Sequence, residues 1–212
     1  MGVLPGLLRS SLRRGEHRRG AVHATKNIAA CALLVWVPAI FCLQSAAQAQ
    51  PAVPAPVASE LAQPRLAGAS RFTFWGFDVY QASLWVEPGF DSATLARQRY
   101  ALELRYLRGF KGRDIAQRSI DEMRRLGRFS EAQAQAWLQA MTQAFPDVAP
   151  GDRLLGIYLP GQGARFLANG RLTAEVMDAE FAQLFFGIWL SDKTSEPRLR
   201  QALLGQTVAS SN

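Results

Sequence analysis

Histidine and cysteine are almost absent from this 212-residue sequence, which contains two of each. All four lie before residue 50, as His17, His23, Cys31 and Cys42. A chain that begins after them has no imidazole and no thiol. This excludes a Ser-His-Asp triad, a cysteine nucleophile, a disulfide, a Cys/His zinc site and an imidazole-ligated haem. We therefore expect no metal and no cofactor, and chemistry limited to carboxylates, Lys, Arg, Tyr and hydroxyl groups.

Acidic residues are also fewer than basic ones over the whole chain, with 17 Asp and Glu against 24 Lys and Arg and a net charge of +7. Such an excess is typical of proteins that bind nucleic acid or a membrane surface. Six of the basic residues and one acid lie in residues 1–49, however. The remaining chain has 18 basic and 16 acidic residues, a net charge of +2. We therefore expect no nucleic-acid partner.

Residues 1–49 have the order of a secretory signal peptide. Basic residues run to Lys26, a 16-residue apolar core follows from 28 to 43, and small residues lead to a cleavage site near Ala49. The core is shorter than the ~20 residues that span a bilayer, and Pro38 interrupts it. The pattern predicts secretion, into the periplasm if the source is Gram-negative. An uncleaved membrane anchor is the alternative.

The composition divides the rest of the chain into three parts. Residues 50–68 carry four prolines and few large apolar residues, which predicts a flexible linker. Residues 69–205 are of a common domain size and predict one folded unit. Residues 206–212 form a short tail.

Periodicity within 69–205 predicts an α+β fold. We expect strands at 79–86, 99–107, 153–159, 164–168 and 171–176, and helices at 114–126, 130–145, 178–190 and 197–204. Residues 71–78 extend the first strand, with a bend or bulge at 76–78. Because strands and helices do not alternate singly, the sheet should be antiparallel, with the helices packed on one face as in an open-faced sandwich.

The stretch 105–113 combines cations and aromatic rings. Its basic residues are Arg105, Arg108, Lys111 and Arg113, and its aromatic residues are Tyr106 and Phe110. Single-stranded nucleic acid binds such patterns, but a secreted chain of charge +2 argues against it. The stretch predicts either cations offered to an anionic small molecule beside a helix start, or a solvated basic loop. The acids Asp121 and Glu122 are expected on a solvated helix face.

Arg71 and Tyr80 are a second candidate pair. A guanidinium and a phenol at the mouth of an apolar cavity would bind a carboxylate. The residues alone favour the alternative, in which Arg71 lies at a strand edge and Tyr80 packs in the core.

A series of short segments resembles the chalcone isomerase-like family, in its bacterial secreted branch. The similarity covers about 140 residues, and the matching segments are LAGASR at 66–71, FWGFDVYQASLWV at 74–86, RRLG at 124–127, PGD at 150–152, Phe181, GIWLS at 187–191 and LLG at 203–205. The resemblance implies an antiparallel sheet layered with helices, with a ligand cleft between them. The family includes isomerases that close chalcones to flavanones and non-catalytic members that bind fatty acids.

The resemblance also assigns site residues. Arg71 matches an arginine that orients the substrate in isomerases and meets the carboxylate in fatty-acid binders. Tyr80 stands where isomerases have threonine and fatty-acid binders have tyrosine, although a gap must fall between it and Arg71. Isomerases also carry a tyrosine at the start of the first long helix. The matching position of this sequence lies near Lys111, and Tyr106 is the nearest residue with a phenol group.

We therefore predict a secreted, non-catalytic binder of a small amphipathic anion such as a fatty acid. Arg71 and Tyr80 would hold the carboxylate, Lys111 or Arg113 would assist, and the ribbon and the helices at 130–145 and 178–190 would line the tail. The first alternative is an intramolecular lyase or isomerase of chalcone-like phenols or enones. In it, Lys111 or Tyr106 stabilises an enolate-like oxygen and Arg71 orients the substrate. The second alternative is an envelope protein without a ligand, whose cleft side chains would fill.

Overall fold

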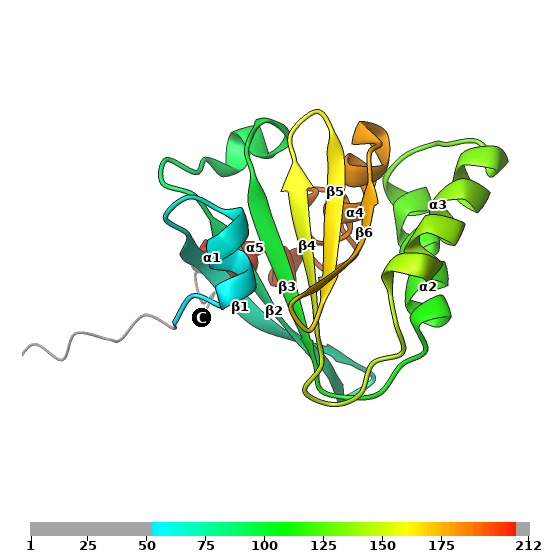
Figure 1. Ribbon diagram of the computed structural model, residues 1–212, viewed down its shortest axis with the longest axis horizontal. Coiled ribbons are helices and arrows are strands. Elements are labelled where there is room, and N and C mark those ends of the chain that lie inside the picture. The colour runs from blue at the N-terminus through cyan, green and yellow to red at the C-terminus, as the bar shows by residue number, and fades with distance from the viewer. Residues whose placement is uncertain (1–51, 207–212) are drawn as a thin grey trace, which may run out of the picture. The chain divides into compact units, whose positions relative to one another are not determined.

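The computed structural model describes residues 52–206, which form an α+β fold around one six-stranded sheet (Figure 1). Every neighbouring pair of strands is antiparallel, and the strands follow one another in chain order. The strands are β1 (Arg65–Phe74), β2 (Phe77–Val86), β3 (Tyr100–Tyr106), β4 (Arg153–Leu159), β5 (Gly163–Ala168) and β6 (Arg171–Val176). The helices are α1 (Ala55–Glu60), the short 3-10 helix η1 (Ser92–Arg97), α2 (Gly112–Leu126), α3 (Glu131–Ala144), α4 (Ala179–Leu190) and α5 (Pro197–Leu203). The predicted fold class is confirmed.

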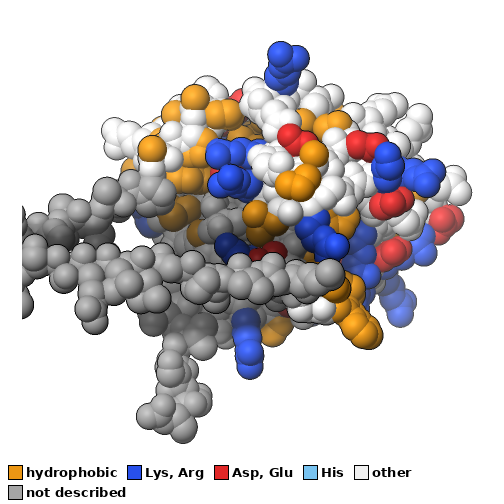
Figure 2. All heavy atoms as spheres, turned by 90° about the horizontal axis from the view of Figure 1, so that it is seen from below, with side chains coloured by type: hydrophobic (Ala, Val, Ile, Leu, Met, Phe, Trp, Pro, Cys, Tyr) orange, Lys and Arg blue, Asp and Glu red, His pale blue; other side chains and the backbone are white. Residues whose placement is uncertain are grey.

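The residues predicted to bend the first ribbon instead belong to a tight hairpin. β1 and β2 are separate antiparallel strands, joined at Trp75 and Gly76. Both residues have positive φ angles, of 51° and 76°, the left-handed conformation that a two-residue hairpin turn requires. The turn lies at the lower end of the molecule in Figure 1. Figure 2 views that end and shows hydrophobic, basic and acidic side chains interspersed on it.

The predicted linker is wrong for much of its length. Residues 55–60 form α1, and β1 already begins at Arg65. Val57 and Leu61 are buried in a small apolar cluster against Trp85. Pro54 and Pro56 do not prevent this, because prolines fit the start of a helix. These two apolar anchors, together with the ion pair between Glu60 and Arg165, hold a segment whose composition resembles a tether.

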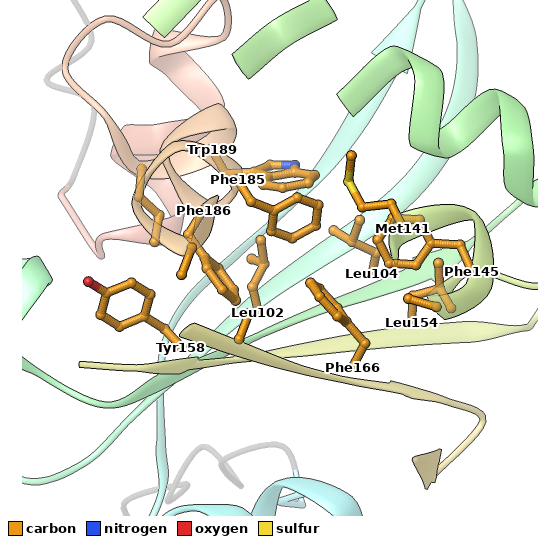
Figure 3. Packing of buried hydrophobic residues seen from close by; sticks show 14 of the residues in the cluster. Leu102, Leu104, Met141, Phe145, Leu154, Tyr158, Phe166, Phe185, Phe186 and Trp189 are labelled. Carbon is orange, nitrogen blue, oxygen red and sulfur yellow. The ribbon is translucent and has the colours of Figure 1, made fainter. Parts of the chain in front are cut away.

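The main core lies between the other face of the sheet and helices α2 to α5. Figure 3 shows Phe185, Phe186 and Trp189 of α4 packed toward the sheet, close to Phe166 of β5. Phe185 and Phe166 meet edge to face, with ring centroids 5.1 Å apart, one of the favoured aromatic geometries. The aromatic side of α4 thereby fixes this helix over the sheet.

The predicted N-terminal caps are confirmed for α3 and α4, and the predicted cap of α2 is wrong. Ser130 with Gln133 forms a capping box at α3, and Asp178 accepts from the Phe181 N–H at α4. α2 does not begin at Asp114 as expected, because it starts at Gly112.

The α2 start has a cap from outside its own sequence. The Gly112 N–H donates to Asp147 Oδ1 at 3.0 Å, and Lys111 Nζ pairs with Asp147 Oδ2 at 2.7 Å. A carboxylate 35 residues away thus replaces the local capping box.

A candidate ligand-binding cavity between sheet and helices

The site is an apolar cavity of about 240 Å³ between the sheet and helices α2, α4 and α5. Its walls come from the main core, and they are mostly aromatic and aliphatic side chains. They include Phe72, Phe74, Val79, Tyr80, Leu102, Leu104, Tyr106, Phe110, Ile115, Phe145, Leu154, Phe166, Phe185, Phe186, Ile188, Trp189 and Leu199. A cavity of ~150 Å³ binds benzene, and drug-sized ligands use roughly 300–1,000 Å³. The volume therefore suits a small ring system or an acyl chain of moderate length.

Strand register decides which side chains reach this cavity. Phe72 of β1, Tyr80 of β2 and Tyr106 of β3 are directly paired across the three strands, so they share the helix-covered face. Arg71 and Gln81 form the next pair and point to the opposite face. One position along the strand therefore separates a cavity residue from an outer-surface residue.

Tyr80 brings a hydroxyl to the cavity, and one hydrogen bond fixes it. The Trp189 Nε1–H donates to the Tyr80 Oη at 3.0 Å. Burial raises the pKa of the Tyr80 phenol, Glu196 and Glu122 nearby raise it further, and the Trp189 hydrogen bond lowers it. The phenol therefore stays protonated at neutral pH. Its O–H has no acceptor among residues 52–206 and is available to an oxygen of a ligand.

Tyr106 provides a second phenol in the same cavity. Its ring meets Tyr80 edge to face at 6.0 Å, and the residue is only 3% exposed. No group in the described part of the chain hydrogen-bonds its hydroxyl. Burial raises the pKa of Tyr106, with a smaller contribution from Tyr80. Trp85 Nε1 is the one fully enclosed polar side-chain atom without a partner in the described chain, so the Tyr106 hydroxyl is accessible. Because Tyr106 lines the cavity, its O–H can donate to a ligand there.

A cluster of charged side chains lies where the cavity reaches the surface. Arg118 pairs with Glu122 one helical turn further along α2, at 2.6 Å. Glu122 is only 8% exposed, accepts from the Ser195 hydroxyl at 3.1 Å and lies 3.6 Å from Arg125. Arg118 is the one basic residue in the cavity wall of the described chain, and its planar guanidinium has further N–H donors. This edge can therefore meet the polar end of a ligand.

Three of the five predicted site residues lie away from the cavity. Arg71 is exposed on the outer face and pairs with Asp78 at 2.6 Å. The prediction that Arg71 and Tyr80 converge on one carboxylate is therefore wrong, because the two side chains point to opposite faces of the sheet. Lys111 forms an ion pair with Asp147 outside the cavity wall. Arg113 is exposed and forms an ion pair with Asp114, the next residue of α2.

The structure brings together Tyr80 and Tyr106, and it adds residues that the sequence analysis missed. Glu122 was expected on a solvated face, but it follows Ile115 and Ser119 at helical spacing on the inward side of α2. That helical spacing could have predicted that Glu122 faces inward. The contact of Glu122 with Ser195 had no such signal, because 73 residues separate the two.

The arrangement is suited to binding. Apolar walls take a hydrophobic body, two phenol donors take an acceptor oxygen, and Arg118 stands at the edge. Within residues 52–206 no three His, Cys, Asp or Glu side chains are grouped as they would be to hold a metal ion. The helices of this part of the chain are all too short or too polar to cross a membrane.

Comparison with known proteins agrees with this architecture. The family model of chalcone isomerase-like proteins matches residues 47–205. An uncharacterized protein of Haemophilus influenzae is 32% identical over 140 residues, which are 66% of this chain and 67% of that protein. The crystal structure of an Arabidopsis thaliana fatty-acid binding protein has the same fold, with a TM-score of 0.54 and 12% identity over 72% of this chain and 91% of that chain. The chain therefore belongs to the chalcone isomerase-like family.

Proposed function

We propose that this protein is a non-catalytic binder of a small amphipathic molecule, with a fatty acid as the best-supported ligand. The observation that carries the proposal is the apolar cavity with two buried phenols, Tyr80 and Tyr106, whose O–H groups have no acceptor in the described chain. The name of the Arabidopsis structural neighbour, a fatty-acid binding protein, supports the same ligand class.

The phenols favour an acceptor oxygen on the ligand. Both stay protonated at neutral pH, so both can donate and neither can attract a cation by charge. A carboxylate accepts two such bonds, and charge-assisted hydrogen bonds are stronger than neutral ones. The tail would then lie along the aromatic residues of α4 and β5.

Arg118 is the one cation that an anionic head group would meet in the described cavity wall, which also carries the carboxylates of Asp114, Glu122 and Glu196. Its pairing with Glu122 at 2.6 Å leaves other N–H donors of the guanidinium for a ligand carboxylate. Arg71, Lys111 and Arg113 take no part in this proposal, because they lie outside the cavity wall.

The isomerase alternative has less support from the geometry. It needed Arg71 to orient a substrate and Lys111 or Tyr106 to stabilise an enolate-like oxygen, and of these only Tyr106 lines the cavity. The structural alternative needed side chains to fill the cleft, whereas a cavity of about 240 Å³ is present.

We also propose that the binder acts outside the cytoplasm, in the periplasm of a Gram-negative source. This rests on the signal-peptide pattern of residues 1–49, which lie outside the described residues.

Isothermal titration of a chain that starts at Gln50 tests the proposal, since this chain contains every described helix and strand and both apolar clusters. The ligands are octanoate, laurate, palmitate and oleate, with methyl laurate as the uncharged match to laurate. We expect saturable binding of at least one carboxylate and weaker binding of the ester. Arg118→Gln should remove most of that preference for charge.

Arg71→Ala is the matched control, because it removes an exposed guanidinium that is also paired with a carboxylate but lies on the other face. It should bind laurate like the parent chain. Loss of binding in Arg71→Ala with full binding in Arg118→Gln would refute this assignment. A chain that binds none of these ligands but cyclises a chalcone above the spontaneous rate would favour the isomerase instead.

A further inference from the structure

The tip of the β1–β2 hairpin carries three exposed aromatic side chains in four residues. Phe74 is 54% exposed, Trp75 85% and Phe77 59%. The rings of Phe74 and Trp75 lie 6.3 Å apart, so they form one small patch. We call these three residues the aromatic tip. Large apolar groups gathered on one exposed turn are typical of an interaction site.

The backbone at the aromatic tip shows that Trp75 does not stabilise the turn. Its φ angle is 51°, a left-handed conformation that is an outlier for a bulky side chain. Asn or Gly is preferred at this place, and Asn-Gly closes the β5–β6 hairpin of this same sheet at 169–170. Trp75 therefore costs conformational energy in the turn and gains little burial in return, which indicates a role outside the fold.

One cation contacts the aromatic tip. The Arg108 guanidinium lies over the Phe77 ring, 4.6 Å from its centroid. Arg108, and Arg105 of β3 opposite Gln81, have no carboxylate partner within residues 52–206. Other cations here are neutralised, because Arg71 pairs with Asp78 on the hairpin. Figure 2 shows this end of the molecule, where basic, acidic and hydrophobic side chains lie side by side.

We propose that the aromatic tip docks on an anionic lipid membrane surface. Trp and Phe side chains insert at the boundary between head groups and acyl chains, and arginines beside them attract anionic head groups. A protein partner would also accept aromatic rings. The combination of a protruding turn with unpaired arginines fits a fluid anionic surface better than a preformed pocket.

This docking would bring the cavity close to the membrane. Phe74 belongs both to the aromatic tip and to the cavity wall. If the proposed function is right, an apolar ligand could pass between the bilayer and the cavity beside this side chain. Docking itself does not depend on the ligand, so the two proposals can fail separately.

Trp75 supplies its own reporter. In the chain that starts at Gln50, the other tryptophans are Trp85, Trp137 and Trp189, which are 3%, 3% and 7% exposed. Phosphatidylglycerol vesicles should shift the emission of Trp75 to the blue, and brominated lipids should quench it. Phosphatidylcholine vesicles should give a weaker response, and added salt should weaken the response to phosphatidylglycerol.

Vesicle co-sedimentation compares variants that keep the fold. Trp75→Asn creates the preferred Asn-Gly turn, so folding should be retained while binding falls on the order of tenfold. Arg108→Gln should weaken binding about fivefold at low salt. Met177→Ser is the matched control, because Met177 is 60% exposed directly after β6, at the other end of the sheet from the aromatic tip, and its loss should leave binding unchanged.

Two results would overturn the proposal. One is a parent chain that fails to sediment with phosphatidylglycerol vesicles at low salt. The other is a Trp75→Asn chain that binds as tightly as the parent. Laurate titration of the same Trp75→Asn chain tests the two proposals separately. Loss of vesicle binding with normal laurate binding concerns the membrane proposal alone and leaves the proposed function unaffected.

Discussion

Tyr106→Phe separates the binding role of a phenol from its role in the fold. The substitution removes one oxygen from a side chain that is 3% exposed and lines the cavity. Because no group in the described chain hydrogen-bonds this hydroxyl, the folded protein loses no internal bond. We expect the free energy of unfolding to change by less than about 0.5 kcal/mol, or to rise slightly.

Ligand binding should change far more. A hydrogen bond to a charged acceptor contributes about 1.5–3 kcal/mol, and each 1.4 kcal/mol is a factor of ten. Laurate affinity should therefore fall by roughly ten- to a hundredfold in Tyr106→Phe. The fall for methyl laurate should be smaller, because a neutral hydrogen bond contributes only ~0.5–1.5 kcal/mol.

Tyr158→Phe is the matched control for this experiment. Tyr158 is also a buried tyrosine, but its hydroxyl donates to the Ala96 carbonyl oxygen at 3.2 Å and it lies outside the cavity wall. Its loss should cost about 1 kcal/mol of stability and leave laurate binding intact. Urea unfolding and isothermal titration measure the two effects on each variant. A Tyr106→Phe chain that unfolds more easily and binds laurate normally would refute the reasoning.

Three further predictions concern stability and processing. Burial raises the pKa of Tyr80 and Tyr106 above the ordinary value of 10.0, so above pH 10 the unfolded chain loses these protons first and stability should fall as pH rises. In urea unfolding at stepped alkaline pH, Tyr106→Phe should reduce that slope by about 1.4 kcal/mol per pH unit, and an unchanged slope would contradict the cause. Gly112→Ala should destabilise the fold by ~1–3 kcal/mol, because a Cβ there would overlap the Phe145 carbonyl oxygen, and an unchanged melting temperature would contradict this contact. Expression of the full chain in a Gram-negative host should give a periplasmic product cut near Ala49, and intact mass that retains residues 1–49 would support the anchor alternative.

Local patterns predicted most of the elements because each signal acts over a few residues. The alternation at 99–107 gave a strand that β3 confirms, and Asn169-Gly170 joins β5 to β6 as predicted. The Asp178 cap starts α4 through a bond to a backbone N–H three residues away. In each case the responsible groups are close in sequence.

The misplaced features depend on a conformation or a contact that the sequence does not mark. Trp75 adopts a left-handed turn that tryptophan rarely adopts, so the hairpin resembled a bend in one strand. The α2 cap comes from Asp147, and the contact of Glu122 with Ser195 joins two distant segments. Arg71 was assigned by resemblance, and the register with Gln81 turns it to the outer face. Sequence identified the family and named two phenols that line the cavity, whereas the presence of Arg118 in the same wall depends on tertiary packing.

Native mass spectrometry of the chain that starts at Gln50, purified gently from a bacterial host, tests the central claim most directly. We predict a mass increment that extracts as a fatty acid and that is much reduced in Tyr106→Phe and Arg118→Gln but present in Arg71→Ala. A protein that carries no adduct, and that stays free when laurate is added in large excess, would contradict the claim that the cavity is a binding site for an amphipathic carboxylate.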